Sequence, residues 1–503
     1  MTDSSFCPSL ALLAEQVRVL RESGKRIVHC HGVFDLLHIG HIRYLRGAAE
    51  LGDVLVVTIT PDRYVDKGPG RPAFHQFLRA EAVASLDCVT SVAVNEWPTA
   101  EETIRLLKPD VFAKGGEFRD LTDEKIRREA AAIAETGGEL VFVEDIVFSS
   151  SHLINKYLAS YSDECREYLN IFRKRYSLDR IFTAMDRFAS LSVLLAGDAI
   201  IDEYVYCSPL GASSKDPVLA LRHESSECFA GGAAAVANHL AQHVSSVTLC
   251  TVLGNDGQEA MFRDRLQPNV ALHAAVAESS PTVRKIRIID GYSFQKHLEI
   301  YHMDASGQTP ECEAALSSLL AGNLPGADLV VAADFGNGCI TSAQAASLAA
   351  CDKFLAVNTQ ANAGNRGYHT IGRYGRADFV SLAGHEIRME YRNSALTQGA
   401  MMADLRKRLK ARYVLVTEGR SGCAIVDADN LQRAPSMAAS VVDRVGAGDA
   451  LFAVTLLCAK LGLPADLTAF LGNIAGSLAV ESIGNAKAVT RDAMNRFITA
   501  ILK

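Results

Sequence analysis

Apolar runs alternate with amphipathic segments along this chain, and the alternation predicts strands and helices in turn. Near-continuous β-branched runs such as Val54–Ile59 are typical of strands buried on both faces of a parallel sheet. Other segments, such as Leu10–Glu22, carry apolar residues at helical spacing. The first part of the chain thus predicts strands at 27–30, 54–59, 91–94, 111–113 and 140–143, and helices at 10–22, 40–51, 77–84, 100–107 and 124–136. We expect a parallel sheet covered by helices on both faces.

A second α/β pattern begins at Ser192. A strand at 193–196 is followed by residues 201–206, which alternate like a half-exposed strand, and by a glycine pair that opens an alanine-rich helix at 231–238. Residues 282–289 and 297–302 are expected to pair as a hairpin across Gly291. Further strands, separated by helices, are expected at 248–252, 329–333, 354–357, 379–381, 413–417 and 423–426. The predicted fold class is α/β, with two doubly wound parallel-sheet domains.

The segment between the two patterns is charged, free of glycine and rich in helix formers. Its basic run, Phe172-Arg-Lys-Arg-Tyr176, could suggest a nucleic-acid or membrane patch, but the composition favours the solvated face of a helix. We therefore expect a first domain over 1–158, a helical linker over 159–190 and a second domain over 191–503.

Size and composition agree with a multidomain enzyme. The chain has 503 residues, 49% of them hydrophobic and 22% charged, which is too long for one ordinary core. Its net charge of −7 argues against extended nucleic-acid binding. We find no apolar run long enough to span a bilayer and no signal-peptide pattern at the start. The twelve cysteines form no C-x-x-C pair, so buried thiols in the cytoplasm are expected.

The motif His31-Gly-Val-Phe-Asp-Leu-Leu-His-Ile-Gly-His41 directly follows the first predicted strand and leads into a helix. His38 and His41 are three residues apart, so they lie on one face of the first helical turn. They then flank the free N–H groups of a helix end, where anions are favoured, and Gly40 permits close approach of a phosphate. The motif predicts a site for a polyphosphate that gains charge during reaction. A metal site and a structural histidine pair are the alternatives.

A second motif, Asp443-Arg-Val-Gly-Ala-Gly-Asp449, precedes an apolar helix near the other end of the chain. The amides of Gly446, Ala447 and Gly448 can turn toward one point and form an anion-binding nest. Asp449 would then lie within reach of a hydroxyl that attacks a phosphate. Helix packing alone is the other explanation of such a glycine-rich turn.

These motifs carry two resemblances. The first resembles the HxGH signature of the nucleotidyltransferase superfamily, and the second resembles the GAGD motif of the ribokinase-like (PfkB) family. Residues 25–158 and 190–503 together resemble the two halves of the bacterial bifunctional heptose kinase/nucleotidylyltransferases. In those enzymes the kinase comes first, so the domain order is reversed here. The resemblance implies a Rossmann-like domain followed by a ribokinase-like domain with a small β lid near 202–221 and 284–302.

For the first half, the resemblance implies that His38 and His41 stabilise the α-phosphate of a nucleotide while Lys67 or Lys114 adds positive charge. The attacking group would be a sugar phosphate, which is already anionic near pH 7. Solvated surface lysine is the alternative for Lys67 and Lys114. The positions expected to bind this nucleotide are Gly32, Phe34, Asp35, Gly40, Lys67, Arg79, Ser149, Ser150 and Ser151.

For the second half, the resemblance implies that Asp449 deprotonates a sugar hydroxyl while the Gly446–Gly448 amides hold the γ-phosphate of ATP. Mg²⁺ would bridge nucleotide oxygens, with Glu386 as the metal residue. The remaining nucleotide-binding positions expected here are Thr417, Gly419 and Asn473. The substrate-binding positions expected are Asp198, Asp202, Gly231, Gly232, Asn238 and Asp334.

The second half also departs from the family pattern. An Asn-x-x-Glu pair usually orders the metal, but Ala383-Gly-His-Glu386 keeps only the glutamate. Asn358-Thr-Gln360 stands where an aspartate often follows the central strand, and Ser213-Ser-Lys-Asp-Pro217 replaces an acid with Lys215. These changes bear on the identity of the substrate and on kinase competence.

The sequence therefore predicts a bifunctional enzyme. It would phosphorylate a heptose-like sugar or sugar phosphate with ATP and transfer CMP or AMP, from CTP or ATP, to a sugar phosphate. A homodimer with small-molecule substrates, and without nucleic-acid or membrane partners, is expected. Two alternatives stay open: a nucleotidyltransferase that carries a silent kinase-like binding or dimerisation domain, and a polyol in place of the sugar.

Overall fold

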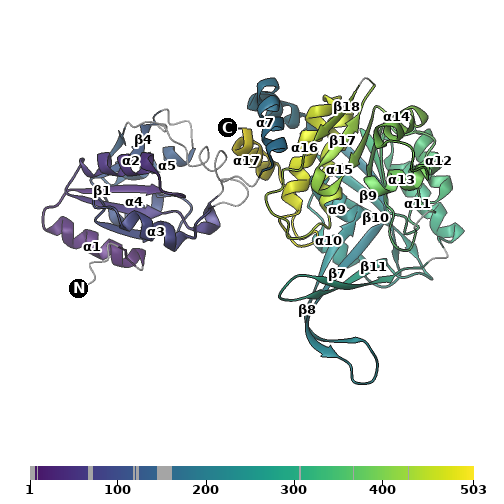
Figure 1. The fold of residues 1–503 in the computed structure, drawn as a ribbon, viewed down its shortest axis with the longest axis horizontal. Helices are drawn as coiled ribbons and strands as arrows, with labels where there is room; N and C mark the ends of the chain where they lie inside the picture. The colour runs from purple at the N-terminus through teal and green to yellow at the C-terminus, as the bar shows by residue number, and fades with distance from the viewer. Residues whose placement is uncertain are drawn as a thin grey trace. The chain divides into compact units, whose positions relative to one another are not determined.

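The computed structural model describes residues 6, 7, 9–65, 72–116, 119, 124–143, 161–304, 307–365, 368–428 and 430–502. The chain divides into two compact units, Met1–Ser160 and Tyr161–Leu502. Figure 1 shows both units, and each is described below by itself. In the described part of the chain, no helix combines the length and the apolar character that a membrane crossing requires.

The first unit is a parallel sheet of five strands in the order β3-β2-β1-β4-β5. Helices α1, α4 and α5 pack on one face, while α2 and α3 pack on the other. The strands are β1 (Ile27–Gly32), β2 (Val54–Ile59), β3 (Ser91–Val94), β4 (Val111–Gly115) and β5 (Glu139–Val143). The helices are α1 (Leu10–Glu22), α2 (Ile39–Ala49), α3 (Gln76–Ala84), α4 (Glu101–Leu107) and α5 (Glu124–Glu135).

This strand order reverses direction between β1 and β4. In doubly wound sheets, ligands bind outside the carboxyl ends of the strands at such a switch point. The loop Val33–His38 leaves β1 at this point and enters α2. The topology therefore places the histidine motif where the fold class favours a ligand.

The second unit contains a sheet of nine strands in the order β10-β9-β6-β13-β14-β15-β16-β17-β18. It is parallel except for β17 and β18, which pair antiparallel at one edge. Its strands are β6 (Ser192–Gly197), β9 (Ser246–Gly254), β10 (Val270–Ala277), β13 (Leu329–Asp334), β14 (Phe354–Thr359), β15 (Phe379–Ala383), β16 (Tyr413–Thr417), β17 (Cys423–Val426) and β18 (Leu431–Ala434).

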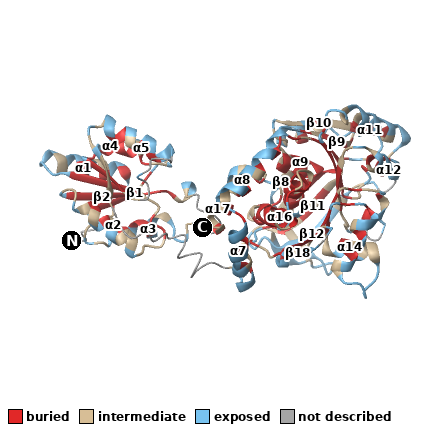
Figure 2. Ribbon diagram, turned by 90° about the horizontal axis from the view of Figure 1, so that it is seen from above, coloured by how far each residue is buried: buried red, intermediate tan, exposed pale blue. Residues whose placement is uncertain are grey.

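Two layers of helices cover this sheet, and in Figure 2 the buried residues concentrate between the layers. One core contains α7 (Asp163–Arg175), α8 (Leu178–Asp186), α9 (Ala233–Ala241), α10 (Glu259–Arg265), α15 (Ala447–Lys460), α16 (Ala465–Ala479) and α17 (Arg491–Leu502). The opposite core contains α11 (Pro310–Asn323), α12 (Ser342–Ala350), α13 (Gly384–Tyr391) and α14 (Gln398–Arg408). Helices α7 and α8, from the segment expected to be a linker, thus belong to the core of the second unit.

A separate small sheet has four strands in the order β12-β11-β7-β8. They are β7 (Ala199–Ala212), β8 (Leu219–Gly232), β11 (Arg284–Asp290) and β12 (Lys296–His302). The antiparallel pairing of β11 with β12 confirms the hairpin predicted across Gly291. The long β7–β8 hairpin extends away from the large sheet (Figure 1).

The boundaries of the first five strands agree with the sequence prediction to within two residues. The second unit differs more. Strands β8, β10 and β18 were not predicted, and β16 and β17 join through a short 3-10 turn at Gly419–Ser421 rather than through a helix. Its sheet is therefore mixed rather than wholly parallel.

Candidate functional site

The histidine pair lies at the N-terminus of α2. His38 is the N-cap residue, and its Nδ1 accepts a hydrogen bond from the Gly40 amide at 3.2 Å, so its ring proton is at Nε2. The rings of His38 and His41 stack with their centroids 3.9 Å apart. Two imidazoles therefore lie side by side at a helix start, where the partial positive charge of the helix favours an anion.

The loop before this helix holds an unusual backbone. Phe34 and Leu36 both have left-handed conformations, with φ of 49° and 50°. Such residues cost of order 1–3 kcal/mol each and cluster at functional sites. The Phe34 ring lies against His41, with 5.4 Å between ring centroids, and a Cβ on Gly32 would approach that ring to 3.0 Å. Gly32 and Phe34 thus shape the wall behind the histidine pair.

Asp35 and Arg79, both expected to bind nucleotide, are buried and hold loops instead. The Asp35 carboxylate accepts hydrogen bonds from the Ala73 and Phe74 amides at 2.8 and 3.1 Å. The Arg79 guanidinium donates to the carbonyls of Phe74, Val33 and Thr60 and pairs with Asp62 at 2.6 Å. Both side chains therefore position loops around the motif, and their contact with a nucleotide stays a prediction.

Lys114 ends β4 next to β1, but its ammonium pairs with a carboxylate. Its Nζ lies 2.7 Å from Oε2 of Glu129 on α5, and both side chains are buried. The other Glu129 oxygen accepts the Ala100 amide at 2.9 Å. Lys114 is therefore not a solvated surface lysine, and Glu129 is a partner that the sequence did not reveal.

The sequence prediction also missed a row of buried, hydrogen-bonded polar side chains on β1 and β2. Thr58 Oγ1 on β2 lies 2.8 Å from His29 Nε2 and 2.9 Å from His31 Nδ1, and His31 Nε2 lies 3.1 Å from Thr60 Oγ1. Burial and the nearby Lys114 charge lower the pKa of His29 to about 3 and that of His31 well below its usual value. Two histidines at alternate positions of an apolar strand were the available signal, because residues two apart share one face. The predicted residues Lys67, Ser149, Ser150 and Ser151 lie outside the described residues.

In the second unit, an open pocket forms between the small sheet and the N-terminus of α15. Its volume is about 200 Å³. Gly446, with φ of 84°, is the N-cap residue of α15, and Asp449 lies in the first turn. The pocket is lined by Ile200, Asp202, Gly232, Lys285, Arg287, Phe335, Gln360, Arg444, Val445, Gly446, Gly448 and Asp449. Of the predicted residues, Asp202, Gly232, Gly446, Gly448 and Asp449 thus meet at one pocket.

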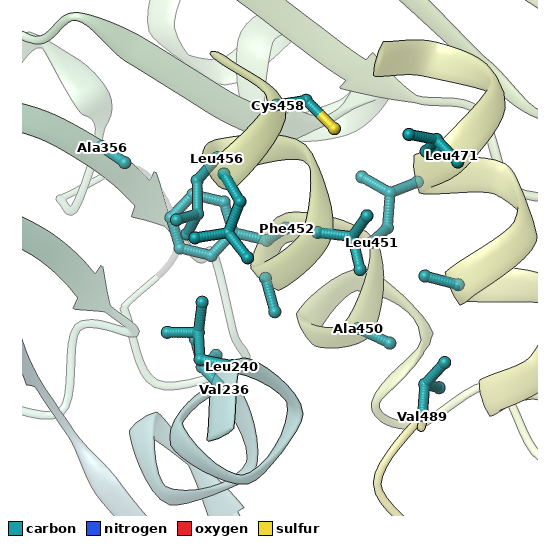
Figure 3. Packing of buried hydrophobic residues seen from close by; sticks show 14 of the residues in the cluster. Val236, Leu240, Ala356, Ala450, Leu451, Phe452, Leu456, Cys458, Leu471 and Val489 are labelled. Carbon is teal, nitrogen blue, oxygen red and sulfur yellow. The ribbon is translucent and has the colours of Figure 1, made fainter. Parts of the chain in front are cut away.

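The position of Asp449 is fixed by the packing of α15. Figure 3 shows Phe452 and Leu456 of this helix directed toward Ala356 of β14, with Val236 of α9 nearby. All four are buried in one cluster. Burial and the neighbouring carboxylates of Asp202 and Glu386 raise the pKa of Asp449 to about 7, although Lys285 opposes the shift. A carboxylate with a pKa near 7 is suited to act as a general base at neutral pH.

The small sheet brings positive charge to this pocket. Arg287 donates to Asp202 Oδ1 at 2.5 Å and to Glu299 at 3.1 Å. Lys285 is 5% exposed, and burial lowers its pKa despite the Asp202 charge. Lys285, Arg287 and Arg444 were missed as site residues. The signal for the first two was their alternation in a predicted strand.

The glycine pair at the end of β8 permits this arrangement. A Cβ on Gly231 would lie 1.9 Å from Asp202 Oδ2, and a Cβ on Gly232, which has φ of 60°, would lie 2.2 Å from the Asp198 carbonyl oxygen. Only glycine leaves room here for the Asp202 carboxylate. Both glycines therefore leave room for the groups that line the pocket, and their contact with a substrate stays a prediction.

Asp198 and Asp334, predicted to bind substrate, do not line this pocket. The Asp198 carboxylate accepts the Phe335 and Cys339 amides at 2.8 and 2.9 Å, and burial with the nearby Asp334 charge raises its pKa to about 6. Asp334 accepts from Tyr374 at 2.8 Å and pairs with Arg373 at 3.0 Å. Both carboxylates thus order the loop after β13, and their role in substrate binding stays a prediction.

Asn238 and Asn473 are also held by protein partners, and their predicted binding roles stay predictions. Asn238 lies well into α9, where its side chain donates to Arg265 and accepts from Gln267 at 3.0 and 2.9 Å. Asn473 is buried and donates to the Ala434 and Ala469 carbonyls at 3.2 Å each. Neither amide lines the pocket.

Three further predicted residues lie at the ends of β15 and β16. Thr417 ends β16, and Gly419, with φ of 59°, opens the following turn. Glu386 lies in the first turn of α13, and its oxygens accept the Ala383 and Ala361 amides at 2.6 and 2.9 Å. In the described part of the chain, no group of three or more His, Cys, Asp or Glu residues is arranged to hold a metal ion.

Family models match both units. Residues 192–491 match the pfkB family of carbohydrate kinases, and residues 29–155 match the cytidylyltransferase-like family. The chain belongs to the pfkB carbohydrate kinase family. Its first unit is cytidylyltransferase-like, and this order is the reverse of the usual one in the HldE proteins.

Curated relatives match the first unit. The chain is 47% identical over 102 residues to the bifunctional protein HldE of Nitratiruptor sp., covering 20% of this chain and 22% of that protein. It is 35% identical over 156 residues to HldE of Citrifermentans bemidjiense, covering 30% of this chain and 31% of that protein. The chain thus matches about a third or less of the length of these relatives. Its two domains support transferase activity of both kinds.

Solved structures resemble the second unit in fold. Phosphofructokinase-2 from Escherichia coli, in complex with substrates and products, superposes with a TM-score of 0.51 at 16% identity, covering 62% of this chain and all of that one. The complex of the same enzyme with potassium superposes with a TM-score of 0.50 at 15% identity, covering 63% of this chain and 100% of that one. At this identity the likeness shows the ribokinase-like fold alone.

Proposed function

We propose that the chain is a bifunctional transferase. One unit phosphorylates a heptose-like sugar or sugar phosphate with ATP, and the other transfers CMP or AMP to a sugar phosphate with release of pyrophosphate. The observation that carries the proposal is Asp449, a carboxylate with a raised pKa at the glycine-rich start of α15, inside a pocket lined by Asp202 and three cations.

In the kinase reaction, Asp449 accepts the proton of the acceptor hydroxyl. The resulting oxygen nucleophile attacks the γ-phosphorus of ATP, the bond to the bridging oxygen breaks, and ADP leaves with that electron pair. The amides around Gly446–Gly448 stabilise the charge on the transferred phosphoryl group. Asp202 and Arg287 orient the acceptor, since their ion pair fixes both groups at the wall of the pocket.

Mg²⁺ is usual for such a reaction. It is bound mainly by nucleotide oxygens and water and needs only one or two carboxylates, so the absence of a three-ligand cluster from the described residues fits it. Glu386, whose charge acts on Asp449, would hold the ion. The metal supplies neutralisation of phosphate charge when bound.

A phosphorylated acceptor is favoured by the charge of the pocket. Arg287 is neutralised by Asp202 and Glu299, but Lys285 forms no ion pair among the described residues. A buried ammonium costs free energy unless an anion accompanies it. Lys285 and Arg444 are therefore available to an anionic group on the acceptor.

In the transferase reaction, an oxygen of the sugar phosphate attacks the α-phosphorus of the nucleotide, and pyrophosphate leaves. The attacking group is already ionised, so no strong base is required. His38 and His41 stabilise the charge that develops on the α-phosphate at the N-terminal end of α2. Lys114 contributes positive charge after it leaves Glu129.

A second candidate is a nucleotidyltransferase whose kinase-like unit is silent. Ala383 supports this candidate, because it lacks the side-chain amide that the family pattern uses to order the metal, while both oxygens of Glu386 accept backbone amides.

We also propose that the protein is a homodimer. The small sheet exposes large apolar residues on β12 and its turn, including Tyr292 at 96% and Leu298 at 57%. Light scattering should give twice the chain mass, and a monomer at micromolar concentration would contradict the dimer.

The function is tested by measuring ADP and pyrophosphate in parallel over a panel of heptoses, other sugars, polyols and their phosphates, with ATP or CTP. Both products within one substrate series are expected. Pyrophosphate without ADP for every acceptor would overturn the kinase half and favour the second candidate. ADP without pyrophosphate would overturn the transferase half.

A further inference from the structure

Asp443 opens the glycine-rich turn, and its buried carboxylate accepts four hydrogen bonds. Oδ2 accepts from the Tyr204 hydroxyl at 2.5 Å and from the Gly484 amide at 3.0 Å. Oδ1 accepts from Lys296 Nζ at 2.7 Å and from the Val445 amide at 3.2 Å. Every oxygen of this carboxylate is therefore engaged at the base of the turn.

These donors come from both sides of the pocket. Tyr204 lies on β7 and Lys296 on β12, so both belong to the small sheet. The Val445 amide belongs to the turn that leads to Asp449. Asp443 is thus a point at which the small sheet is attached to the phosphate-holding turn.

Lys296 is the residue that gives this attachment its charge. The carboxylate is only 8% exposed, and hydrogen bonds to Lys296 and Tyr204 keep the pKa of Asp443 below its usual value despite burial. The Lys296 side chain is 32% exposed and reaches Asp443 from the rim of the small sheet. Arg287, the other cation near the Tyr204 ring, is committed to Asp202 and Glu299. Loss of Lys296 would leave a buried carboxylate without its ion-pair partner.

We propose that Lys296 is a positioning residue for phosphoryl transfer. Its ion pair with Asp443 fastens the small sheet to the Gly446–Gly448 turn, so that the amides of the turn and Asp449 face an acceptor held by the sheet. The proposed role in catalysis rests on the proposed kinase function. The structural contact between the small sheet and the turn does not depend on the kinase function, and a separate experiment measures it.

The fastening is tested by hydrogen–deuterium exchange of the full chain. Lys296→Met should speed exchange in peptides that contain Val445–Gly448 by about tenfold or more, and Lys296→Arg should restore slow exchange. The matched control is Arg284→Met, which removes an ion pair of the same sheet, to Glu203 at 3.1 Å, away from Asp443. Exchange in the turn that is unchanged in Lys296→Met, or equally fast in Arg284→Met, would overturn the proposal.

The catalytic role is tested by steady-state kinetics with an acceptor that wild type turns over. In Lys296→Met, kcat should fall by about ten- to a hundredfold, because a small displacement of reacting groups has effects of this size. KM for the acceptor should change less than about threefold, because Asp202 and Arg287 stay in place. Ammonium or methylammonium should raise the kcat of Lys296→Ala by occupying the vacated position.

An effect on KM alone, or no rescue by either cation, would overturn the catalytic role. Wild type without any ADP formation would contradict the proposed kinase function instead. The exchange experiment would still decide whether Lys296 fastens the turn.

Discussion

Kinase activity should fall below about pH 7, because Asp449 must be ionised to accept the proton of the acceptor. Burial and the charges of Asp202 and Glu386 raise its pKa from 3.8 to about 7. At about pH 6 roughly one-tenth of such a base is ionised, so kcat/KM should lie about tenfold below its plateau. A base with an ordinary aspartate pKa would show almost no loss at that pH.

The assay follows ADP formation at low acceptor and saturating ATP from about pH 5 to pH 9, with pyrophosphate release by the same samples as a control. Two variants sharpen the test. Glu386→Gln removes a negative charge and should move the acid limb to lower pH, whereas Lys285→Met removes the opposing cation and should move it to higher pH. A flat profile down to pH 5, or shifts of the opposite sign, would refute the reasoning.

Three further outcomes are expected. The folded protein binds the Asp449 proton more tightly than the unfolded chain does, so the free energy of unfolding falls as the pH rises from about 4 through about 7. Asp449→Asn should therefore have a higher melting temperature than wild type at pH 8. A difference in melting temperature that does not shrink toward pH 4 would contradict this. Gly231→Ala should raise the acceptor KM at least tenfold, because its Cβ would lie 1.9 Å from Asp202; an unchanged KM would remove that carboxylate from acceptor binding. Glu129→Gln should destabilise the first unit by about 3 kcal/mol in denaturant titrations by removing the carboxylate that pairs with the buried Lys114, and an unchanged midpoint would contradict a buried ion pair.

The elements that the sequence predicts well are those whose burial is complete. Strand β2 is buried throughout and apolar except for Thr58, so its pattern defined its ends. Strand β8 is mostly exposed and polar, and β10 is rich in alanine, so neither carries the β-branched pattern that a prediction requires. Helices α7 and α8 carry many charged residues on one face, so the sequence favoured a solvated linker. Their other face is buried in the core of the second unit.

The same distinction applies to the sites. His38 and His41 meet through local helix geometry, so their proximity was predictable. Lys285 reaches the pocket because β11 pairs with β7 in a register that sets it beside Asp202, which no local pattern reveals. Arg79 was assigned to the nucleotide because sequence does not show the carbonyls that occupy its guanidinium.

The most direct test of the account is to measure ADP and pyrophosphate from wild type, His41→Ala and Asp449→Asn with the same acceptor series. We predict that His41→Ala loses pyrophosphate release and keeps ADP formation, while Asp449→Asn does the reverse. Loss of both products in either variant, with the fold intact by circular dichroism, would contradict two independent phosphate-transfer sites on one chain.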